Sequence, residues 1–295
     1  MAQATGIDAY LAEFAHQRLA SAHTLAAYRR DLAKLVELAD GADPAGLAST
    51  ALRRFVMQLH SRGLSPRSLA RLLSAWRGYY GWLARRQAIA KDPCEGIKAP
   101  KQPRRLPKVL SPDQTVALLD AGAGDDLELR DKAMFELFYS SGLRLAELAG
   151  LDHDKGIDLA EGEVTVTGKR SKTRTVPVGA KAVAAIGEWL VRRPALASAD
   201  EAALFVGRGG GRLSRRAIER RLARWALKCG LGLHVHPHML RHSFASHLLQ
   251  SSGDLRAVQE LLGHSSITAT QVYTHLDYQH LARIYDAAHP RARKK

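Results

Sequence analysis

Imidazole, guanidinium and phenol side chains are concentrated in residues 237–273. His238 and Arg241 are three residues apart, which places them about one turn apart on one face of a helix. A second imidazole follows at His264, and Tyr273 lies nine residues further along the chain. A phosphodiester that is attacked by an oxygen nucleophile gains negative charge, which cations and hydrogen-bond donors stabilise. The stretch therefore combines the groups that phosphoryl transfer to a tyrosine requires.

The charge of the whole chain indicates a polyanionic partner. The 295 residues include 44 Lys and Arg against 29 Asp and Glu, a formal net charge of +15. Such a charge favours nucleic acid or an anionic membrane surface. The sequence contains neither a basic amphipathic helix with exposed apolar residues nor an apolar run long enough to span a bilayer, and no export signal. We therefore expect a cytoplasmic DNA-binding protein whose two cysteines, Cys94 and Cys229, are free thiols.

The first 98 residues repeat apolar positions at the helical period and predict four helices. The clearest begins with Ser65 as a cap and Pro66 at the first helical position. Its polar face includes Arg67 and Arg71. Residues 1–108 hold 18 basic and 8 acidic side chains, so two-thirds of the excess charge lies in about a third of the chain. This segment is predicted to be an N-terminal helical DNA-binding domain, residues 1–98, that grips phosphates.

A basic, proline-rich linker is expected over residues 99–108. Prolines at 100, 103 and 107 prevent a helix and favour an extended, semi-rigid chain. The lysines and arginines beside them allow two interpretations. The linker could lie along a DNA backbone between two domains that hold the duplex, or it could be a charged spacer in water.

Residues 109–295 predict a mixed, mostly helical catalytic domain, and the fold class is mainly α overall. Ser111 begins a helix with a capping-box pattern, and Arg144 lies at the opening turn of a short helix, where anions bind well. Residues 163–167 and 173–178 form a hairpin with a lysine-rich turn, and residues 157–159 supply the third strand of a small antiparallel sheet. The helix over residues 214–229 presents a continuous arginine stripe that is typical of a DNA contact. Its candidate contact residues are Arg215, Arg216 and Arg220.

The order of these motifs resembles a known family, the tyrosine site-specific recombinases of the phage integrase family. The resemblance covers essentially the whole chain. It rests on Arg144 in Gly-Leu-Arg-x-x-Glu-Leu, Lys169 in the hairpin turn, His238-x-x-Arg241, Leu-Gly-His264 and Tyr273. One departure is Ala146, where such proteins commonly have serine; we expect its cost to be a local hydrogen bond at most.

The resemblance implies a role for each of the six residues. Arg144 and Arg241 bind the non-bridging phosphate oxygens as bidentate donors. His238 is the acceptor or general base and His264 donates to a phosphate oxygen. Tyr273 is the nucleophile that forms a 3′-phosphotyrosyl link. Lys169 is the general acid for the leaving 5′-oxygen, with Lys172 as the nearby competitor.

No cofactor, metal or ATP is implied, because the arginines supply the charge that a Mg²⁺ ion would. The histidines are dense enough to suggest zinc, but no cysteine accompanies them and the His-Glu-x-x-His pattern is missing. The set is His234, His236, His238, His242 and His247.

Within the family, residues 260–264, 273–277 and 285–293 are most similar to recombinases that resolve chromosome dimers. This implies double-stranded DNA at a specific site, a XerD-type recombinase in a heterotetramer, and a DNA translocase as activator. A helix over residues 279–288, with Leu281, Ile284 and Tyr285 on one face, is expected to dock on a neighbouring protomer. Two alternatives stay open: a type IB topoisomerase-like strand transferase and a non-catalytic DNA-binding regulator.

Overall fold

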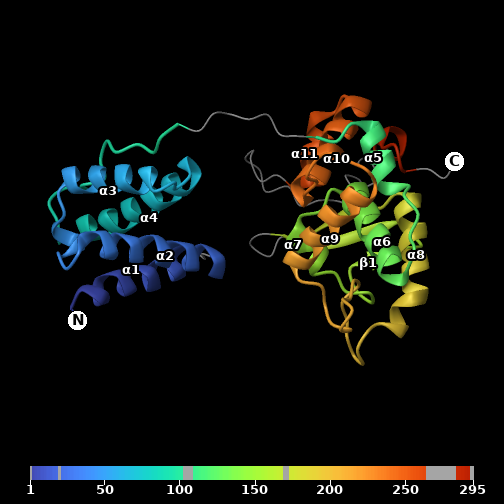
Figure 1. Cartoon of the computed structure of the whole chain (residues 1–295), viewed down its shortest axis with the longest axis horizontal. Helices are drawn as coiled ribbons and strands as arrows, with labels where there is room; N and C mark the ends of the chain where they lie inside the picture. The colour runs from blue at the N-terminus through green and yellow to red at the C-terminus, as the bar shows by residue number, and fades with distance from the viewer. Residues whose placement is uncertain (1, 19–20, 102–108, 169–172, 264–283, 293–295) are drawn as a thin grey trace. The chain divides into compact units, whose positions relative to one another are not determined.

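A computed structural model describes residues 2–18, 21–101, 109–168, 173–263 and 284–292 (Figure 1). The chain forms two compact units, residues 1–105 and 106–295. Most of the predicted linker, residues 102–108, lies outside the described residues. None of the described helices is long and apolar enough to cross a membrane.

The described residues of the N-terminal unit form four α-helices and one short 3-10 helix. They are α1 (Ala2–Arg18), α2 (Ala22–Ala39), η1 (Pro44–Gly46), α3 (Ser49–Ser61) and α4 (Pro66–Arg85). Serine side chains cap two of the helices: Ser21 accepts from the Thr24 amide and Ser65 from the Ser68 amide. Helix α4 contacts the other three α-helices, and Trp76 and Tyr80 on its inner face are fully buried. The predicted four-helix unit is confirmed.

One acidic residue ties α2 to α4 inside this unit. Asp31 is buried, and Arg71 donates to both of its carboxylate oxygens at 2.7 and 2.9 Å. The Trp76 indole N–H donates to the backbone oxygen of the same residue at 2.9 Å. Because an unpaired buried carboxylate is costly, Arg71 stabilises the helix pair as well as adding charge to the surface.

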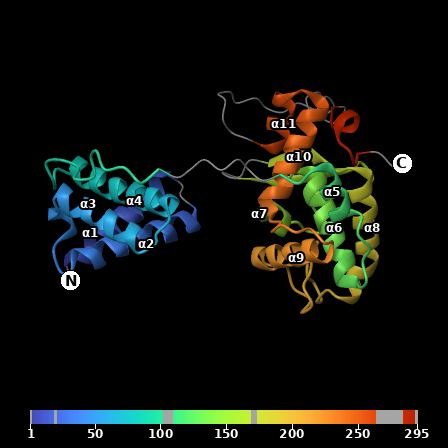
Figure 2. The ribbon, with the colours of Figure 1, turned by 45° about the horizontal axis from the view of Figure 1, so that its top comes forward.

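The part of the C-terminal unit that the structure describes is mostly helical with one small sheet, as predicted. Its helices are α5 (Pro112–Leu119), α6 (Asp126–Ser141), α7 (Leu145–Ala149), α8 (Ala180–Arg192), η3 (Arg193–Ala195), α9 (Arg215–Lys228), α10 (Pro237–Ser252) and α11 (Leu255–Leu262). Helix α6 is buried without a break from Ala133 to Ser141. It runs between α8 and α9 in both views (Figure 1, Figure 2) and also contacts α10. Helix α6 is therefore the centre of this unit.

The sheet has the strand order β1 (Ile157–Asp158), β2 (Glu163–Thr167) and β3 (Thr173–Pro177), all antiparallel. Val164 pairs with Val176 and both are buried, so one face of the sheet covers the core. Strand β3 continues toward α8 and carries Arg174 at its second position. The sheet thus brings an arginine from the hairpin to the region of α7 and α11.

The C-terminal segment packs against its own unit. Residues 284–288 are helical, and Tyr285 is buried with its hydroxyl 2.6 Å from the Ser140 hydroxyl. The carbonyl of Ala292 accepts from the amide of Ala180 at 3.0 Å. Tyr285 was expected on a face that docks on a neighbouring protomer, but it belongs to the core of its own domain because α6 supplies its partner. The rest of that expected helix, residues 279–283, lies outside the described residues.

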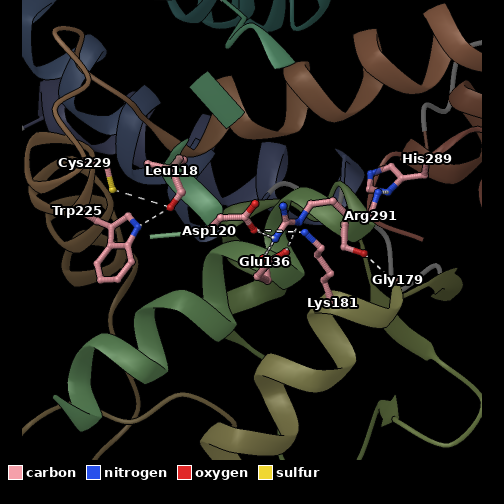
Figure 3. Close-up of polar contacts among 10 residues, drawn as sticks. Leu118, Asp120, Glu136, Gly179, Lys181, Trp225, Cys229, His289 and Arg291 are labelled. Atoms are coloured by element: carbon pink, nitrogen blue, oxygen red, sulfur yellow. Dashed lines mark hydrogen bonds and ion pairs between the residues drawn. The ribbon is translucent and has the colours of Figure 1, made fainter. Parts of the chain in front are cut away.

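Arg291 is the main polar anchor of this segment (Figure 3). Its side chain is 5% exposed and lies against Glu136, which is 2% exposed, and against Asp120. Its Nε donates to a Glu136 carboxylate oxygen at 2.8 Å and one Nη to Asp120 at 2.8 Å. A buried pair of this kind holds the segment in one place, because removing either partner leaves an uncompensated charge.

We predict that Arg291→Ala lowers the free energy of unfolding by about 3–5 kcal/mol, since Glu136 would remain buried without its cation. Denaturant unfolding of the full chain measures the change. Arg192→Ala is the matched control, because Arg192 is 60% exposed and reaches Asp126 only at 3.8 Å. The control should change stability by less than about 0.5 kcal/mol. Equal effects of the two variants would show that the buried ion pair of Arg291 adds no more to the free energy of unfolding than an exposed one.

Candidate active site

The turn between α6 and α7 places Arg144. Helix α6 ends at Ser141 and is capped by Gly142, which has a left-handed backbone with φ of 53°. A Cβ at this position would lie 2.4 Å from the Phe244 ring, so only glycine fits here. Two residues later Arg144 caps α7, and its backbone N–H donates to the Glu147 carboxylate at 2.7 Å. The prediction that Arg144 opens a short helix is confirmed.

Glu147 joins two arginines from different elements. Arg144 donates through Nη1 to Oε1 of this carboxylate at 2.8 Å. Arg174 on β3 binds the same carboxylate with both Nη atoms, at 2.7 and 2.9 Å. Burial alone would raise the pKa of Glu147, but the hydrogen bonds from Arg174 and from the Arg144 backbone lower that pKa to about 2. Glu147 is therefore a fixed negative charge that orients both guanidinium groups.

Arg241 comes from the second turn of α10 and is 8% exposed. Its Nη1 donates to the carbonyl of Gly142, and its Nη2 donates to the carbonyl of Leu262 at 2.6 Å. Burial, together with the charges of Arg144 and Arg174, lowers the pKa of Arg241 to about 10. The guanidinium is still charged at neutral pH, so it is a desolvated cation next to two others.

These three arginines form a cation cluster over one carboxylate. Arg144 is the most accessible, with 34% of its side chain exposed, while Arg174 is 11% exposed. Guanidinium groups are planar, permanently charged and suited to bidentate binding of phosphate oxygens. A site with more cations than carboxylates, partly closed to water, can hold an anion and stabilise further negative charge on it.

Of the other four predicted catalytic residues, the structure describes only His238. His238 is exposed on α10, one helical turn before Arg241. Lys169, His264 and Tyr273 lie outside the described residues. The carbonyl of Gly263, directly before His264, accepts from Nη2 of Arg144 at 2.9 Å. The structure thus brings Arg144 and Arg241 together, and both contact the end of the helix from which the chain continues toward Tyr273.

Arg174 is the residue of the cluster that sequence reasoning missed. It lies in a run of β-branched residues on β3, where a single basic side chain is usually solvent-facing. One feature of the sequence could have pointed to this residue: it is an arginine in a hairpin strand, and the strand follows a Gly-Leu-Arg-x-x-Glu-Leu motif. Only the fold shows that the strand delivers this cation to Glu147.

The histidines form no metal site in the part of the chain that the structure describes, where no three His, Cys, Asp or Glu side chains are grouped to bind an ion. His247 has a structural role, because its ring hydrogen-bonds with the Tyr139 hydroxyl at 2.9 Å and with the Leu110 carbonyl at 3.0 Å.

The predicted DNA-contact arginines are exposed on two helices. Arg67 lies on α4 and Arg215, Arg216 and Arg220 lie on α9. The expected stripe on α9 is not continuous, because Arg221 forms an ion pair with the buried Asp131 of α6. The Arg221 side chain is 25% exposed and its partner Asp131 is 1% exposed, so this arginine is partly committed to a buried carboxylate.

We predict that Arg71 on α4 contributes to the stability of the N-terminal unit and that Arg67 on the same helix does not. Arg71→Gln should lower the free energy of unfolding by about 1–3 kcal/mol, nearer the lower value because its guanidinium is half exposed. Arg67→Gln should leave stability within about 0.5 kcal/mol of the parent. Denaturant unfolding, run beside a DNA half-site titration, checks both. If the two variants unfold alike, the contact with Asp31 is not a stabilising one.

Comparison with known families covers nearly all of the chain. The model of the phage integrase family matches residues 108–280, and that of the phage integrase N-terminal SAM-like domain matches residues 7–87. Tyrosine recombinase XerC 1 of Ralstonia nicotianae is 55% identical over 310 residues, 98% of this chain and 94% of the relative. Tyrosine recombinase XerC of Pseudomonas aeruginosa is 55% identical over 293 residues, 98% and 96% of the two chains.

The fold is also similar to a solved recombinase structure, XerH site-specific recombinase bound to palindromic difH substrate in a post-cleavage complex. The TM-score is 0.71 at 24% identity, over 91% of this chain and 81% of that chain. Two matched domains in the order of the family, and relatives that are 55% identical and matched over 94% and 96% of their own length, establish the relationship. The protein belongs to the phage integrase family, the tyrosine recombinases, which are DNA strand transferases.

Proposed function

We propose that this protein is a site-specific recombinase that cuts and rejoins duplex DNA through a 3′-phosphotyrosyl intermediate on Tyr273. The observation that supports the proposal most strongly is the position of Arg144 and Arg241 within the cation cluster. Both guanidinium groups are fixed by protein contacts and both lie at the C-terminal end of α11, from which the chain leads to His264 and Tyr273. Such a site suits a phosphate that is attacked from that segment.

In the proposed reaction the Tyr273 oxygen bonds to phosphorus and the bond to the 5′-oxygen breaks. Arg144 and Arg241 stabilise the charge on the non-bridging oxygens, and His264 donates to one of them. His238 accepts the phenol proton, which is held tightly at neutral pH because the ordinary pKa of tyrosine is about 10.

Lys169 gives a proton to the leaving 5′-oxygen. The phosphotyrosyl ester replaces the broken bond to the 5′-oxygen and conserves its energy, so a 5′-hydroxyl from another strand can attack the phosphorus, release Tyr273 and reverse the step. The reaction therefore needs neither ATP nor a metal ion in this proposal.

The assembly that we propose follows from the chemistry and from the relatives. Exchange between two duplexes uses four active sites, so a tetramer on DNA is required. The two relatives are tyrosine recombinases XerC, which supports a XerD-type recombinase as the partner and chromosome-dimer resolution at cell division as the process.

In this scheme two domains, residues 1–98 and 109–295, bind the DNA, and residues 99–108 join them. A DNA translocase activates the pair, and the complex acts on nucleoid DNA in the cytoplasm.

A nicked suicide substrate tests this function. The nick releases a short fragment after cleavage, so a covalent protein–DNA adduct accumulates and is visible on a denaturing gel. We expect adduct on a XerC/XerD-type site and none on scrambled DNA. Adduct on both, with relaxation of supercoils by the protein alone, would indicate a type IB topoisomerase. Specific binding without adduct, with and without a XerD-type protein, would indicate a DNA-binding regulator.

A further inference from the structure

We propose that Arg174 is a positioning residue for strand transfer, which holds Arg144 and the C-terminal end of α11 in one fixed arrangement. The inference rests on the proposed function, because it concerns how the phosphate-binding arginines and the nucleophile segment are held together. It comes from three observations on β3, α7 and α11.

The first observation is that three consecutive carbonyls at the end of α11 accept from three different arginines. Leu261 accepts from Nε of Arg174 at 3.2 Å, and the carbonyls of residues 262 and 263 accept from Arg241 and Arg144. The last carbonyls of a helix have no partner within the helix and carry the negative end of its dipole. Cations from β3, α10 and α7 therefore converge on the point where α11 ends.

The second observation separates Arg174 from the other two arginines. All three of its guanidinium nitrogens are used by the protein: both Nη atoms on Glu147 and Nε on Leu261. Among the described residues, Nε of Arg144 and Nε of Arg241 have no such partner. Arg174 gives three of its five N–H groups to the protein and its side chain is only 11% exposed, whereas Arg144 and Arg241 each give two, so Arg174 keeps the fewest donors for a phosphate. Arg174 therefore acts through other residues.

The third observation is the contact between Arg174 and Gly263. This glycine ends α11 with φ of 62°, and a Cβ there would lie 3.1 Å from Cδ and 3.2 Å from Nε of Arg174. The arginine side chain occupies the space that a side chain at 263 would need. The turn that leads out of α11 is thus packed directly on Arg174.

These contacts make Arg174 a bridge with two ends. At one end it keeps the buried Glu147 ionised, and Glu147 orients Arg144 through Nη1. At the other end it holds the turn from which the chain continues to Tyr273. A shift of about 1 Å between a bound phosphate and its nucleophile costs on the order of 10²-fold in rate. Loss of Arg174 should therefore slow cleavage more than it weakens DNA binding.

The first test is single-turnover cleavage of the nicked substrate by Arg174→Gln and Arg174→Lys at saturating DNA. We expect half-site affinity within about twofold of the parent and cleavage slowed by about 10–100-fold, with lysine the milder change because it keeps the charge. A loss of affinity as large as the loss of rate would overturn the proposal, because it would place Arg174 on the DNA. A parental rate would overturn it as well.

The pH profile supplies a readout that a purely structural role would not move. Burial raises the pKa of Glu147 once Arg174 is gone, so the carboxylate protonates as the pH falls and Arg144 loses its acceptor. The cleavage rate of Arg174→Gln should fall on going from about pH 8 to about pH 5 more steeply than that of the parent. The additional Glu147→Gln change should remove this extra slope. Identical profiles in the parent and Arg174→Gln would contradict the proposed link.

A second pair of variants tests the α11 contact with Arg174 intact. Gly263→Ala and Gly253→Ala both place alanine at a left-handed helix end, with φ of 62° and 68°, but a Cβ at 253 meets nothing within 4 Å. Backbone strain is thus matched, and only the 263 variant pushes on Arg174. We expect Gly263→Ala alone to slow cleavage, at parental affinity. Equal rates would overturn the proposal, whereas absence of adduct from the parent protein would instead refute the proposed function.

Discussion

Tyr273→Phe is expected to form no covalent adduct with the nicked substrate while binding the same site with parental affinity. The reason is that phenylalanine lacks the oxygen that bonds to phosphorus, and no other group can take over the ester. Phenylalanine keeps the aromatic ring, so assembly on DNA should not change. A gel-shift titration beside the denaturing gel measures both properties on one substrate.

The chain offers a matched control for this variant. Tyr278 is the second tyrosine within residues 264–283, five residues after Tyr273. Tyr278→Phe should keep the parental level of adduct. If adduct persists in Tyr273→Phe and disappears in Tyr278→Phe, the nucleophile has been assigned to the wrong tyrosine.

Arg241→Lys is expected to lower the single-turnover rate of adduct formation by about 10²–10³-fold, the range found when one oxyanion-stabilising donor is removed. Arg241 binds the carbonyls of Gly142 and Leu262 and keeps further donors for a phosphate. The ammonium group of lysine carries the charge but not the planar fork, so it cannot make both carbonyl contacts and a bidentate phosphate contact. The charge is retained, and DNA affinity should fall much less than the rate.

Comparison of rate and affinity at several substrate concentrations checks this expectation. Arg192→Lys serves as a control because Arg192 is exposed on α8 in a weak ion pair. Its cleavage rate should match the parent. Parental cleavage by Arg241→Lys would mean that the position requires only a positive charge, and the bidentate role would be wrong.

Much of this architecture is predictable from local patterns. The apolar period and the Ser65–Pro66 start determine α4, and the alternation of β-branched residues determines β2 and β3, because these signals act over a few residues. The motif around Arg144 is also local: a glycine that ends one helix and an arginine that begins the next. The order of the six motif residues, together with the net positive charge, is enough to predict a DNA strand transferase.

Residues that act through distant partners are not predictable in this way. Arg174 is one basic side chain in a strand, and its partner Glu147 lies 27 residues earlier in the chain. Arg291 is one basic side chain near the C-terminus, 155 residues after Glu136. Sequence periodicity predicts that a residue faces the core or the solvent, but it does not predict which buried charge will meet it.

The sequence by itself therefore determined the family, the helices and strands, and the identity of the residues proposed for chemistry. Tertiary structure alone decided which arginines are available to a phosphate and which are committed to protein contacts. Among the described residues, Arg144 and Arg241 each give two guanidinium N–H groups to the protein, Arg174 gives three, and Arg221 pairs with the buried Asp131. The physical reason is that a buried charge must find its partner across the fold, so its role depends on packing between elements and not on its neighbours in sequence.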